Sequence, residues 1–326
     1  MKRGLIAWDR KELPPEAFES RLAGVRKSLA ERDLPALVIY TDVWRSNQGR
    51  HFSNFMPYWN RALIVLPRDG APVLLCALSP RVYAWIRSVT ILDEIRPSGN
   101  LTQKLLEMCT EKQWKQLGIL DLSRLSEDLF LPIQAAEIEA LDMPSSTVWP
   151  STDDWELEMH RRAAKLARSV LTEEFPEAAG CTDHEFAGRL ERRFRRAGAE
   201  DLVLLFTDGE TVPHSAHGAK ITESSSVSVA LEYRGHWIKL SRPHPCSGVA
   251  APLENLFRAS VKTLGADLNT PVYVETLSGP YPYESCERSA IEPGALFALQ
   301  IASRSGQHRW FYGDTGWRAP GGAELL

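Results

Sequence analysis

The chain has 326 residues, of which 38 are Lys or Arg and 42 are Asp or Glu, so its formal net charge is -4. This length exceeds what one small hydrophobic core usually needs, and two domains are expected. The one basic run, residues 189–196, lies on a predicted amphipathic helix beside Glu185 and Glu191, which indicates a solvated face and argues against a nucleic-acid-binding protein.

The sequence carries no sign of a membrane or secreted protein. No apolar run approaches the length that crosses a bilayer, and the N-terminus lacks the apolar core and cleavage site of a secretory signal. The five cysteines are odd in number and never form a C-x-x-C pair: Cys76, Cys109, Cys181, Cys246 and Cys286. A reducing compartment suits them best, so we expect a cytoplasmic protein with neither membrane nor nucleic-acid partners.

The first half of the chain alternates helix and strand signals. Apolar residues recur at helical spacing over 18–29, and Pro35 separates that segment from a short apolar run at 36–40. Two further apolar runs, 61–66 and 72–78, flank the turn sequence PRDG, which predicts a hairpin. Helices are expected near 80–87 and 101–116, and strands at 91–95 and 117–122. Residues 1–150 are therefore expected to form an α/β domain.

The second half opens with two helix starts. Asp153 precedes Glu156 by three residues, and Thr182 precedes Glu185 in the same way, as a capping box requires. Gly198 is expected to end the second helix. The chain beyond it is mostly strand, at 202–206, 227–233, 237–241, 271–276, 295–302 and 309–312. After a turn-rich linker, residues 151–326 are thus expected to form an α+β domain in which two helices precede a curved antiparallel sheet.

Several local motifs follow one another along the chain. They are the aromatic-rich RHFSNF at 50–55, the turn PRDGAP at 67–72, DWELEMHRRAA at 154–164, TDHE at 182–185, GDT at 313–315 and GAELL at 322–326. In wording, order and spacing they resemble the creatinase/prolidase/aminopeptidase P family over nearly the whole chain. The resemblance implies a pita-bread fold, with an α/β N-terminal domain and an α+β C-terminal domain. It also implies a homodimer in which the N-terminal domain of one chain borders the other's cleft.

Metal enzymes of this family hold a dinuclear centre made of two aspartates, one histidine and two glutamates. The pattern G-Y-x-x-D-x-T-R matches residues 235–242 and puts Lys239 where the second aspartate belongs. The two glutamate positions match Gln300 and Gly313. A lysine opposes metal binding directly, and neither glutamine nor glycine supplies the negative charge that two divalent ions need. We therefore expect no metal and no cofactor.

Two other ligand positions follow from the same resemblance. The first aspartate belongs on the strand at 227–231, where it aligns with Leu231 or Ala230. The histidine belongs to a G-H-G-x-G segment that does not occur between Arg242 and Pro293. That interval is shorter than in the family, so a helix and part of a hairpin are expected to be missing.

Creatinase has this fold and also lacks the metals, and the resemblance implies a histidine that acts as acid and base. The matching segment is TVPHS at 211–215, so His214 is the predicted catalytic residue, with an ordinary loop histidine as the alternative. His217 completes an H-x-x-H pair that invites a metal interpretation. Without a third ligand nearby, we interpret His217 as a supporting residue of the substrate site or as a surface group.

Four more side chains are predicted to line the substrate site. Lys239 and Arg242 suit an anionic group, and Gln300 takes one of the positions at which creatinase grips its substrate. Because Gln300 is neutral, a guanidinium substrate such as creatine would lose a charge-assisted partner. Glu232 could slip into the place of the lost aspartate, since this hairpin is shorter than the family's.

Lys239 has a second interpretation. It could form an internal ion pair that fills the vacated metal position, with Glu232, Glu284 or Asp314 as its partner, because a buried lysine without a partner is costly. Nearby aromatic residues are expected in the core or in a pocket wall; these are Tyr281, Tyr283, Trp310 and Trp317.

Two classes of function follow. The first is a metal-independent, creatinase-like hydrolase or lyase that acts on a C–N bond of a small anionic substrate, with His214 as acid and base. The second is a catalytically inactive pita-bread pseudoenzyme that binds a ligand or a partner protein. The shortened interval after Arg242 favours the second, and the retained His214 and Arg242 favour the first. A metallopeptidase with relocated ligands is a distant third.

We predict that the purified protein holds no zinc, manganese, iron or cobalt at the family's dinuclear position. The reason is the loss of anionic ligands at Lys239, Gln300 and Gly313, which leaves too little negative charge for two divalent ions. Elemental analysis that finds about one metal per chain or more bound at this cleft would contradict the prediction.

Overall fold

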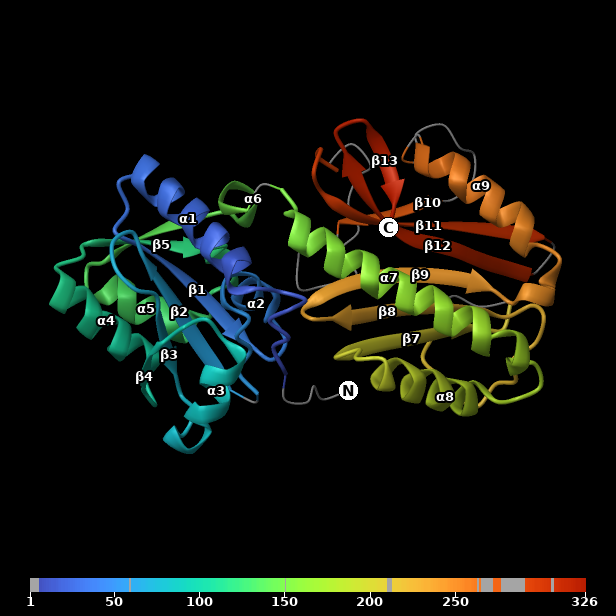
Figure 1. Cartoon of the computed structure of the whole chain (residues 1–326), viewed down its shortest axis with the longest axis horizontal. Coiled ribbons are helices and arrows are strands. Elements are labelled where there is room, and N and C mark those ends of the chain that lie inside the picture. The colour runs from blue at the N-terminus through green and yellow to red at the C-terminus, as the bar shows by residue number, and fades with distance from the viewer. Residues whose placement is uncertain are drawn as a thin grey trace. The chain divides into compact units, whose positions relative to one another are not determined.

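A computed structural model describes residues 6–58, 60–149, 151–209, 213–262, 264, 272–276, 291–305 and 308–326, with the backbone alone for 272–276 and 305. The chain divides into two compact units between Ser151 and Thr152. Each unit is built on its own β-sheet (Figure 1). Within the described residues, no helix is both long and apolar enough to cross a membrane.

The N-terminal unit is a mixed sheet in the order β4-β3-β2-β1-β5-β6. Its strands are β1 (Ala36–Asp42), β2 (Arg61–Pro67), β3 (Val73–Cys76), β4 (Glu94–Pro97), β5 (Gln116–Leu120) and β6 (Glu139–Met143). The expected hairpin of β2 and β3 is antiparallel, whereas β1 pairs with β5, and β5 with β6, in parallel. Strand β1 is apolar at both faces because helices cover both sides of the sheet.

Two groups of helices cover the two faces of this sheet. Helices α1 (Pro15–Glu31), α2 (Asn47–Ser53) and α3 (Tyr83–Val89) share a core with the side chains of Leu37 and Ile39. Helices α4 (Leu101–Lys112) and α5 (Glu127–Ala135) pack on the other face, against Val38. The short α6 (Ser145–Val148) lies in the stretch that the sequence predicted as a linker.

The C-terminal unit is an antiparallel sheet in the order β10-β11-β12-β9-β8-β7, with β13 on the far end of β12. Its strands are β7 (Asp201–Thr207), β8 (Ser226–Tyr233), β9 (His236–Pro243), β10 (Val272–Thr276), β11 (Leu296–Ser305), β12 (His308–Ala319) and β13 (Gly322–Leu325). Strands β8 and β9 turn at Arg234 and Gly235, both at positive φ, as a two-residue hairpin loop requires.

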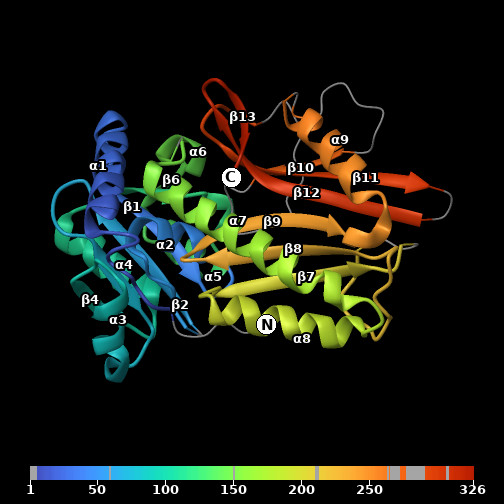
Figure 2. The ribbon, with the colours of Figure 1, turned by 45° about the vertical axis from the view of Figure 1, so that its right-hand side comes forward.

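Three helices lie on one face of this sheet (Figures 1 and 2). Helix α7 (Asp154–Glu174) packs on β8 and β9, and α8 (Asp183–Arg196) lies beside it. Helix α9 (Ala250–Lys262) packs on β11, β12 and β13. The capping box at Thr182 and Glu185 is present, with both reciprocal hydrogen bonds, and Asp153 caps α7 by accepting the N–H of Glu156 at 2.7 Å.

The sequence patterns found most elements and missed a few. The strand expected at 91–95 begins three residues later, as β4, and α2, α5, β6 and α9 were not expected at all. Helix α2 is polar in sequence, and α5 carries Pro132 inside it. Local propensity argues against both helices, so their tertiary contacts must stabilise the helical conformation.

Candidate functional site

Four residues form a row across neighbouring strands of the C-terminal sheet. Gln300 of β11 lies opposite Gly313 of β12, Gly313 lies opposite Ser241 of β9, and Ser241 lies opposite Ser228 of β8. Gln300 and Gly313 are the two positions that the sequence resemblance matches to glutamate ligands. Ligands of one metal centre must converge, so the row is where such a centre would lie on this sheet.

The row is closed by hydrogen bonds between neutral groups. The hydroxyl oxygens of Ser228 and Ser241 are 2.6 Å apart, and the amide nitrogen of Gln300 donates to Ser241 at 2.6 Å and to Ser228 at 3.4 Å. A Cβ on Gly313 would lie 2.8 Å from the carbonyl oxygen of Leu299, so a larger residue there would need the backbone to move. The cavity beside the row measures about 10 Å³, about the size of one water.

These residues do not fit a dinuclear metal centre. Two hydroxyls, one amide and one glycine bring no negative charge, whereas two divalent ions need several carboxylates. The residues that the resemblance matches to the two aspartates lie close to this row. Lys239 lies opposite Ala230, two residues from Ser241 along β9, and lines the same small cavity as Ser241, Gln300 and Gly313. Leu231, the other residue matched to the first aspartate, lies in the core beneath the helices.

Glu232 lies outside the row. It lies on β8 four residues from Ser228, which is roughly 13 Å along a strand. Its side chain is buried, opposite Trp237. Lys239 lines the small cavity beside Gln300, and its backbone N–H and carbonyl both bond the hydroxyl of Thr315.

Arg242 lies on the opposite face of the sheet from Ser241, because neighbouring residues of a strand alternate. Its guanidinium bonds the carboxylate of Asp314 at 2.6 Å and stacks over Tyr312, with 4.3 Å from its central carbon to the ring centroid. Arg168 of α7 bonds both oxygens of the same carboxylate at 3.0 Å. Asp314, one of the three partners predicted for Lys239, is therefore bound by two arginines; a second, Glu284, lies outside the described residues.

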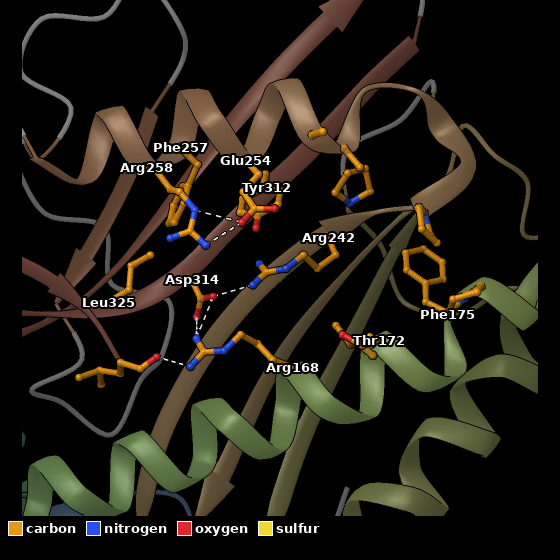
Figure 3. A pocket seen from close by; sticks show the side chains of 17 residues that line it. Arg168, Thr172, Phe175, Arg242, Glu254, Phe257, Arg258, Tyr312, Asp314 and Leu325 are labelled. Carbon is orange, nitrogen blue, oxygen red and sulfur yellow. Dashed lines mark hydrogen bonds and ion pairs between the residues drawn. The ribbon is translucent and has the colours of Figure 1, made fainter.

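A large cavity opens on this helix-covered face (Figure 3). It measures about 690 Å³ and lies between α7 and α9, over β9 and β12. Helix α7 packs on β8 and β9 and α9 packs on β11 and β12, so the cavity lies between the two helices where β9 and β12 adjoin. In Figure 3, Asp314 lies between Arg168 and Arg242, and Arg258 and Glu254 project from α9 toward the same space.

The lining of this cavity joins a charged floor to apolar walls. Besides the charged groups named above and Tyr312, it is lined by Leu171, Thr172, Phe175, Pro176, Pro243, Pro245, Ala250, Ala251, Phe257, Leu325 and Leu326. Burial raises the pKa of Tyr312, so the phenol keeps its proton and stays a hydrogen-bond donor at neutral pH. Of the predicted substrate residues, Arg242 alone is in this lining.

His214 and His217 lie in the loop after β7. His214 pairs with Phe206 as an isolated bridge at the outer edge of β7, so five strand spacings separate it from Gln300, a distance on the order of 20 Å. His217 lies beside it, with ring centroids 4.3 Å apart. The predicted site residues are thus divided among four places. Gln300 belongs to the closed row with Lys239 beside it, Glu232 is buried further along β8, Arg242 lies in the large cavity, and the histidines lie in the loop.

Comparisons with known proteins identify the architecture. No family model and no curated protein matches the sequence. The X-Pro aminopeptidase from Thermotoga maritima MSB8 superposes with a TM-score of 0.73 at 14% identity, over 93% of this chain and 96% of that one. The chain has the pita-bread fold.

Two more solved structures agree with this fold. The prolidase from Pyrococcus horikoshii OT3 has a TM-score of 0.71 at 10% identity, over 94% of this chain and 97% of that one. The N-terminal domain of the FACT complex subunit SPT16 from Eremothecium gossypii has a TM-score of 0.59 at 13% identity, over 95% of both. The expected α/β plus α+β pita-bread architecture is confirmed. Sequence identities this low support a shared fold but say nothing about a shared function.

Sequence reasoning missed Ser228, Ser241, Arg168 and the role of Asp314. The two serines could have been found only from the strand register, which the hairpin length sets. A signal for Asp314 was present, since it stands in the matched GDT motif. Nothing in the sequence pointed to Arg168, which lies 146 residues away from Asp314.

We predict that Asp314→Ala destabilises the protein by about 3 kcal/mol, because removing the carboxylate leaves two half-buried guanidiniums uncompensated. Asp314 is 3% exposed. The matched control is Glu158→Ala, which removes an exposed ion pair with Arg162 on α7 and should cost less than about 1 kcal/mol. Urea unfolding of both variants measures the difference, and equal midpoints would contradict the prediction.

Proposed function

We propose that this pita-bread protein is a ligand-binding protein without peptidase chemistry, and that its ligand is a small amphipathic anion held between α7 and α9. The observation that carries the proposal is the contrast between two sites. The cavity over Arg242 and Asp314 measures about 690 Å³, whereas the one beside Ser241 and Gln300 measures about 10 Å³.

The large cavity has the dimensions of a small-molecule site. Ligand pockets typically enclose about 300–1,000 Å³ and combine apolar walls with a few convergent polar groups. Here Phe175 and Phe257 supply aromatic wall, while Arg168, Arg242 and Tyr312 supply donors at the floor. The residues of the row offer nothing comparable, because their polar groups already bond one another.

The charge of the lining favours an anion. Its side chains hold three arginines against two carboxylates, Asp314 and Glu254, an excess of one positive charge. Besides Asp314, Arg168 donates to the carbonyl oxygen of Leu326, and Arg242 donates to those of Ser241 and Gly313. A guanidinium carries five N–H donors, so these bonds do not use all of them. Arg258 pairs with Glu254 at 2.7 Å at the exposed rim of the cavity. An exposed ion pair of this kind contributes little to stability. A carboxylate ligand can therefore bond these guanidiniums.

We predict that alkyl and aryl carboxylates bind the protein and that Thr172→Trp weakens their binding at least tenfold by filling the cavity. Thr172 is an exposed residue of α7 that lines the cavity, so the fold should tolerate the change. Ser169→Trp, at an exposed α7 position outside the lining, is the matched control. Calorimetric titration with a carboxylate series measures both.

The corresponding alcohols and amines test the charge preference. Carboxylates should bind more tightly than the alcohols and the amines. Arg258→Gln should reduce this difference in affinity, because it removes a positive charge at the rim of the cavity. Carboxylates that bind no better than amines, or a Thr172→Trp variant with unchanged affinity, would contradict the proposed site.

The metal-independent hydrolase remains a second candidate. It draws on the Nε2 atom of His214, which is buried and has no hydrogen-bond partner among the described residues. Against it stands the separation of His214 from Lys239 and Gln300, which share no cavity lining with the histidine. In such an enzyme the proton transfer would fall to His214, since the neutral residues of the row do not fit a metal that could acidify a water.

If the protein is a hydrolase, His214→Ala should lower turnover by roughly 10²–10⁴-fold, the usual contribution of general acid–base catalysis. His217→Ala should have a distinctly smaller effect. A screen of small amides, ureas and N-acyl amino acids must first find a substrate. An active protein in which His214→Ala keeps full turnover would eliminate this mechanism, and no turnover on any candidate would favour the binding protein.

A further inference from the structure

Three potential metal ligands meet outside the row and outside the large cavity. Asp183 is the first residue of α8, and His214 and His217 lie in the loop that follows β7. One ligand atom from each lies within 4.8 Å of the other two. The third ligand that the H-x-x-H pair lacked in the sequence is thus supplied by Asp183, 31 residues before His214.

Asp183 presents an ionised, immobilised carboxylate. Its side chain is 1% exposed, and its two oxygens accept the backbone N–H groups of His217 at 3.0 Å and Gly218 at 2.8 Å. Each carboxylate oxygen has further lone pairs, so these bonds leave room for a cation.

His214 is held in the tautomer that binds metals. Its Nδ1 atom lies 2.9 Å from the carbonyl oxygen of Ser215. A carbonyl can only accept, so Nδ1 carries the proton, and in the neutral ring the lone pair belongs to Nε2. That Nε2 atom is buried without a hydrogen-bond partner among the described residues. Metal-binding histidines commonly have their second nitrogen fixed by a carbonyl in this way.

His217 completes the geometry. Its Nδ1 atom lies 3.4 Å from the Oδ2 atom of Asp183, which is long for a hydrogen bond but matches the ~3.4 Å between two ligands that bind one tetrahedral ion at about 2.0–2.1 Å. The side chain is 56% exposed, so water can reach a fourth position. A plain His217–Asp183 ion pair would account for these two residues and would leave the Nε2 atom of His214 unexplained.

We propose that Asp183, His214 and His217 form a mononuclear site for Zn²⁺, with water as the fourth ligand. Two imidazoles and one carboxylate are borderline ligands of the kind that zinc prefers. The ion would link the loop that carries His214 and His217 to the N-terminus of α8, at the edge of β7. The expectation of a metal-free protein came from the lost dinuclear ligands, which lie on β8, β9, β11 and β12, and it does not extend to this site.

The test uses the full chain without a histidine tag, stripped with EDTA and titrated with Zn²⁺ by calorimetry at neutral pH. We expect one saturable equivalent per chain and an increase in the thermal unfolding midpoint on binding. His217→Ala should weaken binding more than about tenfold, the lower end of what losing even an outer-shell partner costs. Because His217 is exposed, this variant should fold.

Two further variants and a spectrum make the test specific. Asp183→Asn keeps one side-chain oxygen that can accept a backbone N–H group of the loop, but it removes the negative charge. This variant should also weaken the binding of Zn²⁺. His308→Ala, at an exposed histidine of β12 outside the cluster, is the matched control and should bind as the unaltered protein does. Co²⁺ in place of Zn²⁺ should give the visible absorption of a four-coordinate site, which His217→Ala should abolish.

No saturable binding by the unaltered protein would overturn the proposal. Equal affinities of the unaltered protein and His217→Ala would overturn it as well, because the ion would then lie elsewhere. None of these readouts depends on ligand binding between α7 and α9, so this site and the proposed function fail independently. Zn²⁺ bound to the Nε2 atom of His214 would take the lone pair that the alternative hydrolase mechanism needs, so those two roles of His214 exclude each other.

Discussion

The C-terminal sheet depends on a seam where its two halves meet, between β9 and β12. Backbone pairing there is confined to Gly313 and Ser241, whereas β8 and β9 pair over their whole length. Side chains supply the missing bonds. Thr315 bonds both backbone groups of Lys239, and Arg242 bonds the carboxylate of Asp314 and the carbonyl oxygen of Gly313. Arg168 then ties α7 to the same carboxylate.

The seam organises both faces of the sheet because side chains alternate along a strand. On β9, Ser241 points to one face and bonds Ser228 and Gln300, while Arg242 points to the other and bonds Asp314. One face of the seam is therefore closed by neutral hydrogen bonds. The other carries buried charges whose desolvation is offset by pairing, and these charges form the floor of the large cavity.

This arrangement joins the strands of the sheet through bonds between its own neutral side chains. A pair of divalent ions with carboxylates from several strands would cross-link the seam from the face of Ser241. Here Ser228, Ser241 and Gln300 bond one another directly across the same strands. These bonds cross-link the strands as metal ligands would. The side chains that make them are neutral, so they do not supply the charge that would polarise a substrate. That is why the proposed function is binding, and why it is assigned to the opposite face.

The sequence by itself determined the fold class and both capped helices of the C-terminal domain. Those conclusions rest on local information, such as the capping box at Thr182 and the hairpin patterns. The tertiary structure alone decided which residues meet. Strand register decided that Ser228 and Ser241 meet Gly313 and Gln300, since a shift of two residues keeps the face but changes the neighbours. The contact of Arg168 with Asp314 and the approach of Asp183 to His214 join residues 146 and 31 positions apart. Such pairs leave no periodic trace in a single sequence, because their geometry is fixed only when the sheet, its helices and the loop after β7 pack together.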